Sequence, residues 1–183
     1  ILMTLDDLGL AGDTLVVFTA DHGLCAGHHG MWGMGDHSRP LHMFQENLRV
    51  PLVFRHPSRM PEGCVVNTMV NHYDFLPSLV EYLGIEGETS DMAERPGRSY
   101  ASALTDGASD WGEEITFHEY ENTRAVQTPQ WKLVQRHPDG PDELYDMRND
   151  PGEERNLAED EAHADTFAAL SERLGAFFER YSD

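Results

Sequence analysis

The sequence predicts an α/β fold with a small α+β subdomain, and three observations support this. A continuous apolar run over 14–20 is typical of a buried strand. Short alternating segments gather in the last third of the chain, as in an antiparallel sheet. An amphipathic pattern ends the chain, as in a helix that packs on such a sheet. This order predicts a mixed-sheet α/β core over 1–112 and a C-terminal α+β subdomain over 113–183.

The elements of the core follow from the spacing of its apolar residues. Leucines at helical spacing over 1–10, followed by glycines, predict a helix that ends before the strand at 14–20. A second strand is expected at 50–57, where prolines stop it, and a helix at 73–84. A buried strand such as 14–20 pairs with parallel neighbours, which this chain does not supply. We therefore expect residues 1–183 alone to be poorly soluble.

The subdomain follows a connector at 85–112 that is polar and rich in turn residues. Four strands are predicted after it, at 115–121, 123–128, 130–136 and 143–146. The final helix has one apolar face, which consists of Phe167, Leu170, Leu174, Phe177, Phe178 and Tyr181. This face must dock on another element, and the sheet is the natural partner.

Charge and composition exclude several classes of partner. The formal net charge of −20 repels nucleic acid and anionic membranes, so neither is expected as a partner. No run of 18 apolar residues is present, so no membrane span is expected. Two cysteines without a CxxC pair suggest neither a disulfide framework nor a zinc site. The sequence begins inside an apparent helix, which we interpret as a cut within a longer chain. The sequence does not distinguish a periplasmic or secreted location from a cytoplasmic one.

The strand at 14–20 ends in Asp21 and His22, which marks a candidate metal site. Ligands of open α/β sheets sit at the carboxyl ends of strands, and Gly23 lets the backbone leave strand geometry there. A carboxylate and an imidazole suit Mn, Zn or Fe, with Ca or Mg less typical. Two ligands are too few for a closed site, so others must come from elsewhere. The alternative is an aspartate that caps a turn beside a surface histidine.

Several stretches then match one known family in order. These are TLVVFTADHG, GHHGMWG, ENLRVPLVFRHP, NHYDFLPSLVEYLGI, TRAVQTPQWKLVQ and ELYDMRNDPGEERNLA. The set resembles the sulfatase family of the alkaline phosphatase superfamily and covers most of the chain. The resemblance implies the C-terminal portion of an alkaline phosphatase-like fold.

The resemblance also implies roles for individual residues. Asp21 and His22 match two ligands of the catalytic cation, usually Ca²⁺, with Mn²⁺ or Mg²⁺ possible. His29 matches a histidine near the ester group, which implies a contact or proton-donating role; the alternative is a hydrogen bond that braces the loop. The family nucleophile is a formylglycine made from Cys- or Ser-x-Pro-x-Arg. Neither Cys25 nor Cys64 fits that motif, so formylglycine is expected in the N-terminal remainder of the same polypeptide.

The clearest departure from the family pattern is Met34, which stands where a lysine would contact the sulfate. Methionine carries no charge and donates no hydrogen bond. His37 and Arg39 follow closely, and either is a candidate substrate-binding residue that replaces the lysine; the alternative for both is a solvated or structural role. Trp32 is the best candidate for an aromatic substrate wall.

Other charged residues have simpler interpretations. Glu46 and Arg49 are spaced for a local ion pair that braces the loop. Asp74, at the start of the helix over 73–84, is expected to cap that helix rather than bind a metal. His118 and Lys132 in the subdomain are placed to reach toward a cleft, as C-terminal residues do in the family.

Taken together, these features predict the C-terminal portion of a metal-dependent sulfatase that hydrolyses a small-molecule or carbohydrate sulfate ester. The chain alone lacks the nucleophile and is expected to be inactive. One alternative is a phosphodiesterase or phosphonate monoester hydrolase of the same superfamily, which Met34 keeps open. The other is a non-catalytic sulfatase-like fragment that acts as a binding or structural module.

Overall fold

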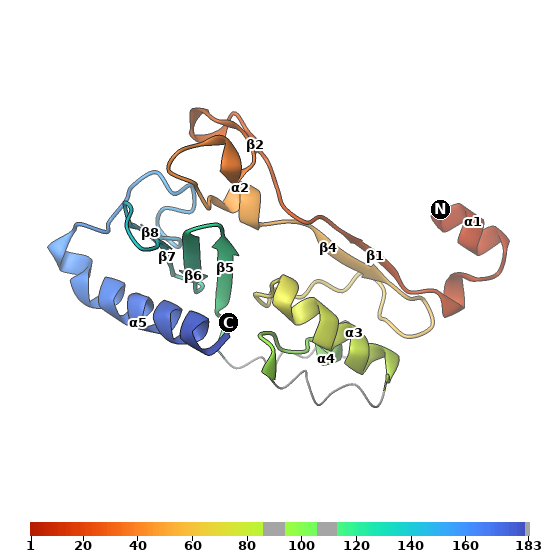
Figure 1. The fold of residues 1–183 in the computed structure, drawn as a ribbon. Helices are drawn as coiled ribbons and strands as arrows, with labels where there is room; N and C mark the ends of the chain where they lie inside the picture. The colour runs from red at the N-terminus through yellow and green to blue at the C-terminus, as the bar shows by residue number, and fades with distance from the viewer. Residues whose placement is uncertain (86–93, 106–112, 182–183) are drawn as a thin grey trace. The chain divides into compact units, whose positions relative to one another are not determined.

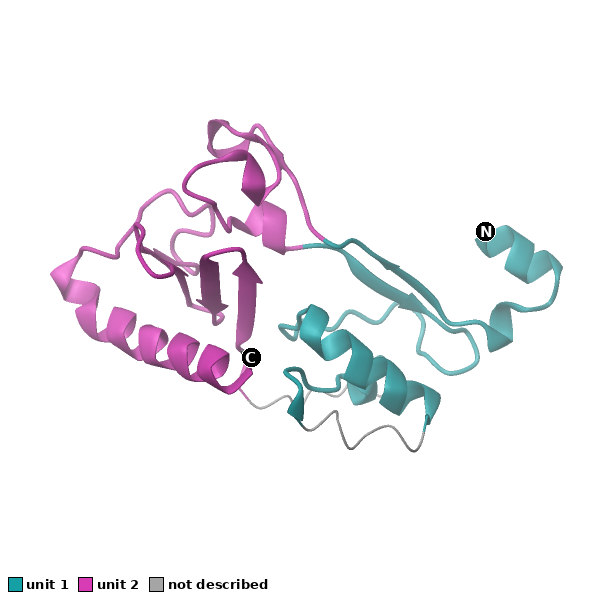
Figure 2. Ribbon diagram, in the orientation of Figure 1, with its two compact units in different colours: residues 1–21, 50–112 teal, residues 22–49, 113–183 magenta. Residues whose placement is uncertain are grey.

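A computed structural model describes residues 1–85, 94–105 and 113–181 (Figure 1). The chain forms two compact units (Figure 2). The first unit contains residues 1–21 and 50–112, and the second contains 22–49 and 113–183. The histidine-rich loop that follows the first strand therefore packs with the C-terminal segment, whereas the sequence-based division at residue 112 grouped it with the core.

The first unit has one two-stranded ribbon and short helices. Its elements are α1 (Leu2–Asp7), η1 (Ala11–Asp13), β1 (Val16–Thr19), β4 (Leu52–Arg55), η4 (His72–Asp74), α3 (Phe75–Leu83) and α4 (Ala101–Thr105). The predicted helices and strands of this region are confirmed, each shorter than expected. Helix α4 falls in the predicted connector and was missed; the remainder of that connector lies partly outside the described residues.

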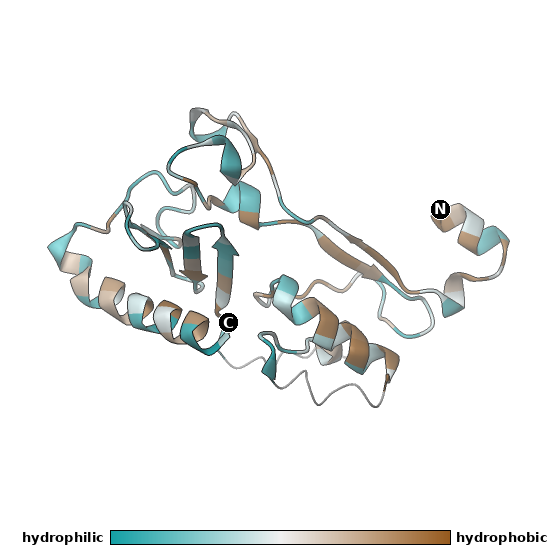
Figure 3. Cartoon of the chain, viewed as in Figure 1, coloured by the Kyte–Doolittle hydropathy of each residue, from teal (hydrophilic) through white to brown (hydrophobic). Residues whose placement is uncertain are grey.

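The ribbon of β1 and β4 is antiparallel, with Phe18 opposite Val53. One face is covered, because the Phe54 ring lies 6.3 Å from that of Phe75 and 5.9 Å from that of Tyr100. The other face is open: Phe18 is 64% exposed and Val53 56%. The expectation that this strand is buried is therefore wrong within the described residues, whereas the expectation that its parallel neighbours are not supplied here agrees with its one antiparallel partner, β4. The strand's apolar composition is nevertheless clear from the colouring of Figure 3.

Asp74 stands at the N-cap position of α3, but its side chain makes no capping hydrogen bond to that helix, so the predicted cap is wrong; with Asn71 it forms a capping box around the preceding η4 turn instead. Its carboxylate accepts hydrogen bonds from the backbone N–H groups of Asn71, at 2.9 Å, and Arg98, at 2.7 Å. Burial raises the pKa of the Asp74 carboxyl, although these hydrogen bonds oppose the rise. Gly84 ends the helix with a φ of 67°, which glycine adopts without strain.

The second unit holds the histidine-rich loop and a four-stranded sheet. Its elements are β2 (Cys25–Ala26), η2 (His28–Gly30), β3 (Trp32–Gly33), η3 (Gly35–His37), α2 (Gln45–Leu48), β5 (Thr116–Tyr120), β6 (Thr123–Gln127), β7 (Trp131–Arg136), β8 (Glu143–Asp146), η6 (Glu161–His163) and α5 (Ala164–Tyr181). The four predicted strands and the final helix are confirmed. The small β2–β3 hairpin inside the loop was not predicted.

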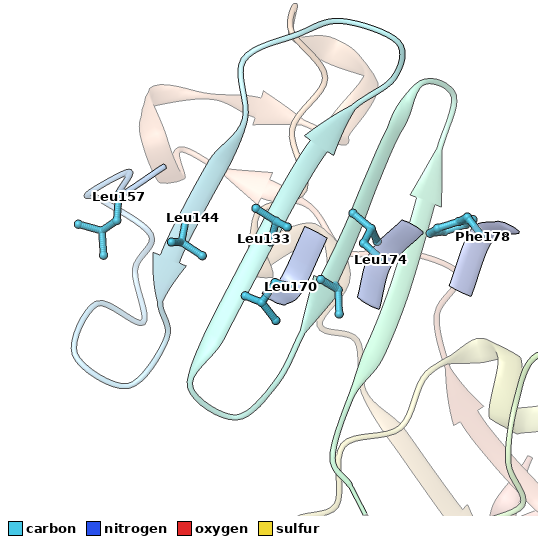
Figure 4. Packing of buried hydrophobic residues seen from close by; sticks show 7 residues of the cluster. Leu133, Leu144, Leu157, Leu170, Leu174 and Phe178 are labelled. Atoms are coloured by element: carbon cyan, nitrogen blue, oxygen red, sulfur yellow. The ribbon is translucent and has the colours of Figure 1, made fainter. Parts of the chain in front are cut away.

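Strands β5 to β8 form an antiparallel sheet in chain order, and α5 packs on one of its faces (Figure 4). The buried cluster between them consists of Val126, Leu133, Leu144, Leu157, Leu170, Leu174 and Phe178. At its border the rings of Phe117 and Phe177 stack 3.9 Å apart. The apolar face predicted for the final helix therefore docks on this sheet. Within the described ranges, no helix combines the length and apolar character that a bilayer crossing needs.

The opposite face of the sheet is covered by residues of the histidine-rich loop. Met43 packs there against Ala125 and Val134. Side chains alternate across a strand, so Lys132 and Arg136 share the Val134 face of β7. Both are buried, and the Lys132 side chain is 0% exposed. The interpretation that Lys132 reaches toward a cleft is wrong, since it points into the interior of the second unit.

The segment DPGEERNL, after β8, ties the loop to the sheet through its side chains. Asp150 accepts hydrogen bonds from two backbone N–H groups of its own turn. Asn156 accepts one from the Leu144 N–H and donates one to the Asp142 carbonyl. Leu157 enters the core between sheet and helix. The segment is therefore a local structural motif, and Glu153 within it pairs with Lys132.

Candidate functional site

Asp21 and His22 follow β1 after one intervening residue, Ala20, and both are exposed. The chain is held just after them, because the Gly23 N–H donates a hydrogen bond of 2.8 Å to the Asn47 carbonyl. A Cβ atom at Gly23 would lie 1.9 Å from the Glu46 carbonyl oxygen. Only glycine permits this close approach of two backbones, so Gly23 fixes where the chain just after His22 lies relative to α2.

The donor chemistry of this pair suits a divalent cation. His22 Nδ1 lies 2.9 Å from the Gly23 carbonyl oxygen, which can only accept, so Nδ1 donates this hydrogen bond and Nε2 is the ring nitrogen left for a metal. Such a hydrogen bond commonly orients a metal-binding histidine. The carboxylate of Asp21 adds an oxygen donor. In the parts of the chain that the structure describes, no group of three or more acidic, histidine or cysteine side chains is arranged to hold an ion. The residues therefore fit part of a metal site.

His29 lies in η2 with a φ of 54°, an uncommon conformation for a residue with a side chain. Its ring stacks flat on the Phe44 ring, with centroids 3.7 Å apart and an interplanar angle of 7°. Its Nε2 lies 3.6 Å from Glu46 Oε2, and the side chain is only 16% exposed. Glu46 therefore faces His29, and the predicted Glu46–Arg49 pair is wrong, since no ion pair or hydrogen bond joins these two described side chains.

A buried polar layer lies behind His29, and sequence reasoning missed it. The Asn47 Nδ2 atom lies 3.1 Å from His42 Nδ1 and 3.5 Å from Cys25 Sγ. Burial lowers the pKa of the His42 imidazole, and the neighbouring His29 lowers it further. Burial also raises the pKa of the Cys25 thiol, with Glu46 adding to the rise. Cys25 is therefore held as a neutral thiol, consistent with a structural role rather than a nucleophilic one.

The three predicted substrate-binding residues lie at the outer side of the loop. His37 Nδ1 lies 2.7 Å from Asp36 Oδ1 and accepts a hydrogen bond from the Met34 N–H. The Arg39 guanidinium donates to the carbonyls of Asp36, at 3.1 Å, and Ser38, at 2.8 Å. Trp32 is 75% exposed. Among the described residues, no hydrogen bond or ion pair joins His37 or Arg39 to His29.

Comparisons with known proteins identify the family to which the chain belongs. Residues 30–180 match a family model described as N-sulphoglucosamine sulphohydrolase, C-terminal. The chain is similar to an N-acetylglucosamine-6-O-sulfatase of Bacteroides thetaiotaomicron, 26% identical over 195 aligned residues, which cover 100% of this chain and 33% of that protein. The chain thus spans about a third of the length of this curated relative.

Solved structures extend the similarity to the fold. A protein in complex with its substrate D-glucosamine-2-N,6-O-disulfate superposes with a TM-score of 0.80 at 25% identity, covering 100% of this chain and 37% of that one. A phosphonate monoester hydrolase from Silicibacter pomeroyi superposes with a TM-score of 0.83 at 26% identity, covering 100% of this chain and 38% of that one. Sulfatases and phosphonate hydrolases therefore share this part of their fold.

Proposed function

Since this chain belongs to the sulfatase family of the alkaline phosphatase superfamily, as its C-terminal portion, we propose that the protein hydrolyses a sulfate ester of a carbohydrate. The observation that carries this proposal is the Asp21–His22 pair at the end of β1, with His22 oriented by its hydrogen bond to Gly23. The sulfated glucosamine bound by a structural neighbour supports a sulfated sugar as the substrate class.

In this proposal Asp21 and His22 would hold a divalent cation, with further ligands from outside the described residues. Ca²⁺ is the first candidate, and Mn²⁺ or Mg²⁺ are alternatives. A cation bound there supplies Lewis-acid stabilisation of the charge on the ester oxygens. The nucleophile, a formylglycine, would come from outside this chain.

His29 would act as the general acid. When the bond between sulfur and the bridging oxygen breaks, the leaving oxygen takes the bond's electron pair and needs a proton. Because Nε2 of His29 faces Glu46, the proton would be given from Nδ1. Trp32 would form a wall beside the sugar, and its exposure is consistent with contact to a ligand.

His37 and Arg39 would line the site only after giving up local contacts. Each now binds groups of its own turn, so neither is already placed to replace the lysine missing at Met34. A loop rearrangement on binding would release their donors toward an anion. Without it, the sulfate would lack one positive neighbour.

The test uses the full-length protein with Asp21→Asn, His22→Gln and His29→Ala, and with His28→Ala as the matched control. His28 is the exposed neighbour of His29. We expect the first two variants to lose bound metal, measured by elemental analysis, and to lose hydrolysis of glucosamine 6-sulfate. His29→Ala should keep the metal and lose activity by about 10²- to 10⁴-fold. Unchanged metal content and activity in all three would overturn the proposal.

A phosphonate monoester hydrolase is the second candidate. It is favoured by Met34, which removes a positive charge expected near a sulfate, and by the similarity to a phosphonate monoester hydrolase. The ratio of turnover of an aryl sulfate to that of a phenylphosphonate monoester distinguishes the two. If sulfate is the substrate, Met34→Lys should raise that ratio; a protein that prefers phosphonate before and after the change would support the second candidate.

A further inference from the structure

A buried ion pair joins the C-terminal sheet to the histidine-rich loop. The side chains of Lys132 and Glu153 are 0% and 1% exposed, and their charged groups are in contact. Charges cost much free energy when buried unless they are paired and fully hydrogen-bonded. Further hydrogen bonds add to the pairing here: Lys132 Nζ also donates to the Met43 carbonyl, and Glu153 Oε2 accepts a 2.6 Å hydrogen bond from the Gln45 N–H.

The two backbone groups that this pair holds lie on either side of Phe44. The Met43 carbonyl precedes that residue and the Gln45 N–H follows it. A second buried cation on the same strand extends the hold, since Arg136 Nε donates a 3.1 Å hydrogen bond to the Leu41 carbonyl. The backbone around Phe44 is therefore fixed from the sheet by charged side chains rather than by strand pairing.

The fixed backbone around Phe44 affects His29, because the Phe44 ring stacks flat against the His29 ring. A flat stack at 3.7 Å restricts rotation of the imidazole plane, and Glu46, in the helix that follows Phe44, faces its Nε2. The position of the His29 ring thus depends on the position of Phe44.

The backbone of Glu153 indicates that the pair is maintained at a conformational cost. Its φ is 53°, in the left-handed region that side chains rarely adopt. Glycine would adopt this conformation freely, yet the position holds a glutamate whose carboxylate binds two different parts of the chain. Strained residues of this kind persist where surrounding contacts determine them.

We propose that Lys132 and Glu153 are positioning residues for His29: their ion pair holds Phe44 in place as the platform that orients the imidazole. The proposal rests on the proposed function, in which His29 donates a proton to the leaving group. Lys132 and Glu153 touch neither substrate nor reacting atoms, because both are buried behind the loop.

The test replaces the pair by apolar side chains of similar size, Lys132→Met with Glu153→Met, in the full-length protein. Such replacements of a buried pair are often neutral for stability. Phe44→Leu serves as the reference for a lost stack. The matched control makes the same changes in the exposed Arg173–Glu113 pair of the same unit.

Two readouts separate positioning from folding. In histidine-labelled protein, the ring signals of His29 should shift in the double variant toward their values in Phe44→Leu, and the control should leave them unchanged. Turnover of the aryl sulfate should fall on the order of 10- to 100-fold in kcat, with KM little changed, as expected for a misplaced catalytic group. Adding Phe44→Leu to the double variant should cost no further activity, because the two changes act through one contact.

His29 signals at their wild-type positions in a folded double variant would contradict the proposal. Should the double variant fail to fold, Glu153→Gln replaces it, since glutamine keeps an acceptor for Gln45 but loses the charge; unmoved His29 signals there would be equally contradictory. The His29→Ala variant tests the proposed function separately. If that variant stays fully active, His29 is not the general acid. The ring signals would still show whether the Lys132–Glu153 pair positions the His29 ring.

Discussion

The β5–β8 sheet and the β1–β4 ribbon differ in how many of their faces are covered. The sheet β5–β8 has α5 on one face and the loop residues around Met43 on the other. The β1–β4 ribbon is covered on the side of Phe54 and leaves Phe18 and Val53 exposed on the other. The ribbon strands, VVFT and LVFR, are more apolar than the alternating strands of the larger sheet, so composition does not explain why the ribbon is the less covered of the two.

The comparison shows that the apolar composition of a strand does not by itself determine how much of the strand is buried. Burial also depends on which other elements are present to cover it. Full burial of a side chain such as phenylalanine contributes about 1.5–3 kcal/mol relative to exposure. In the second unit the apolar side chains are buried against one another and gain this free energy. In the ribbon, Phe18 and Val53 are exposed and gain only part of it. We therefore expect the second unit to hold most of the stability of residues 1–183.

The largest effect is expected from Glu153→Ala, which leaves Lys132 buried without its partner. Burial already lowers the pKa of Lys132, and Glu153 opposes this. Removing one member of a buried pair costs about 3–5 kcal/mol. Urea denaturation followed by circular dichroism measures the change. A loss below about 1 kcal/mol, the value of an exposed pair, would show that the site is hydrated or adaptable.

Leu174→Ala comes next and tests the comparison itself. Leu174 is buried between α5 and the sheet, so its truncation should cost about 2–5 kcal/mol. Phe18→Ala removes a larger side chain from the exposed face of the ribbon and should change the free energy of unfolding by no more than about 0.5 kcal/mol. Equal losses in the two variants would mean that the ribbon is covered in solution.

Acidification should weaken the second unit through His42. Its pKa in the folded protein is lower than its ordinary value of 6.5, so the folded state binds fewer protons than the unfolded state. The stability is therefore complete above pH 6.5 and is lost as the pH falls through the lowered pKa. The expected result is a lower melting temperature at the lower pH. Thermal unfolding at pH 7.5 and pH 5 measures it, and His42→Gln should reduce the difference between the two.

The smallest effect is expected from Arg173→Gln. Arg173 pairs with Glu113 in an exposed position, and pairs of this kind contribute about 0.2–1 kcal/mol. Repeating the denaturation in 1 M salt should remove even this difference, because screening then acts over about 3 Å. A loss as large as that of Glu153→Ala would contradict the contrast between exposed and buried pairs.

Periodic segments were predictable from the sequence, and the histidine-rich loop was not. The strands around Leu133 and the apolar face of α5 follow directly from residue spacing, which encodes the side that is buried. The stack of His29 on Phe44 has no such signal, because it depends on a backbone that side chains from β7 hold in place. The sequence offered one clue to this, a lysine and an arginine at 132 and 136, on the same face of a strand otherwise rich in apolar residues.

The sequence by itself determined the periodic strands and helices, the order of the family motifs and the adjacency of Asp21 and His22 near a strand end. These properties are local, since they depend on residue type and spacing along the chain. Only the tertiary structure decided that Lys132 is buried with Glu153, that Glu46 faces His29 rather than Arg49, and that one face of the ribbon stays open. Each of these outcomes joins residues distant in sequence or depends on what covers a surface. A charged side chain has the same covalent structure in water and in a core, and the fold alone supplies the partner that makes its burial possible.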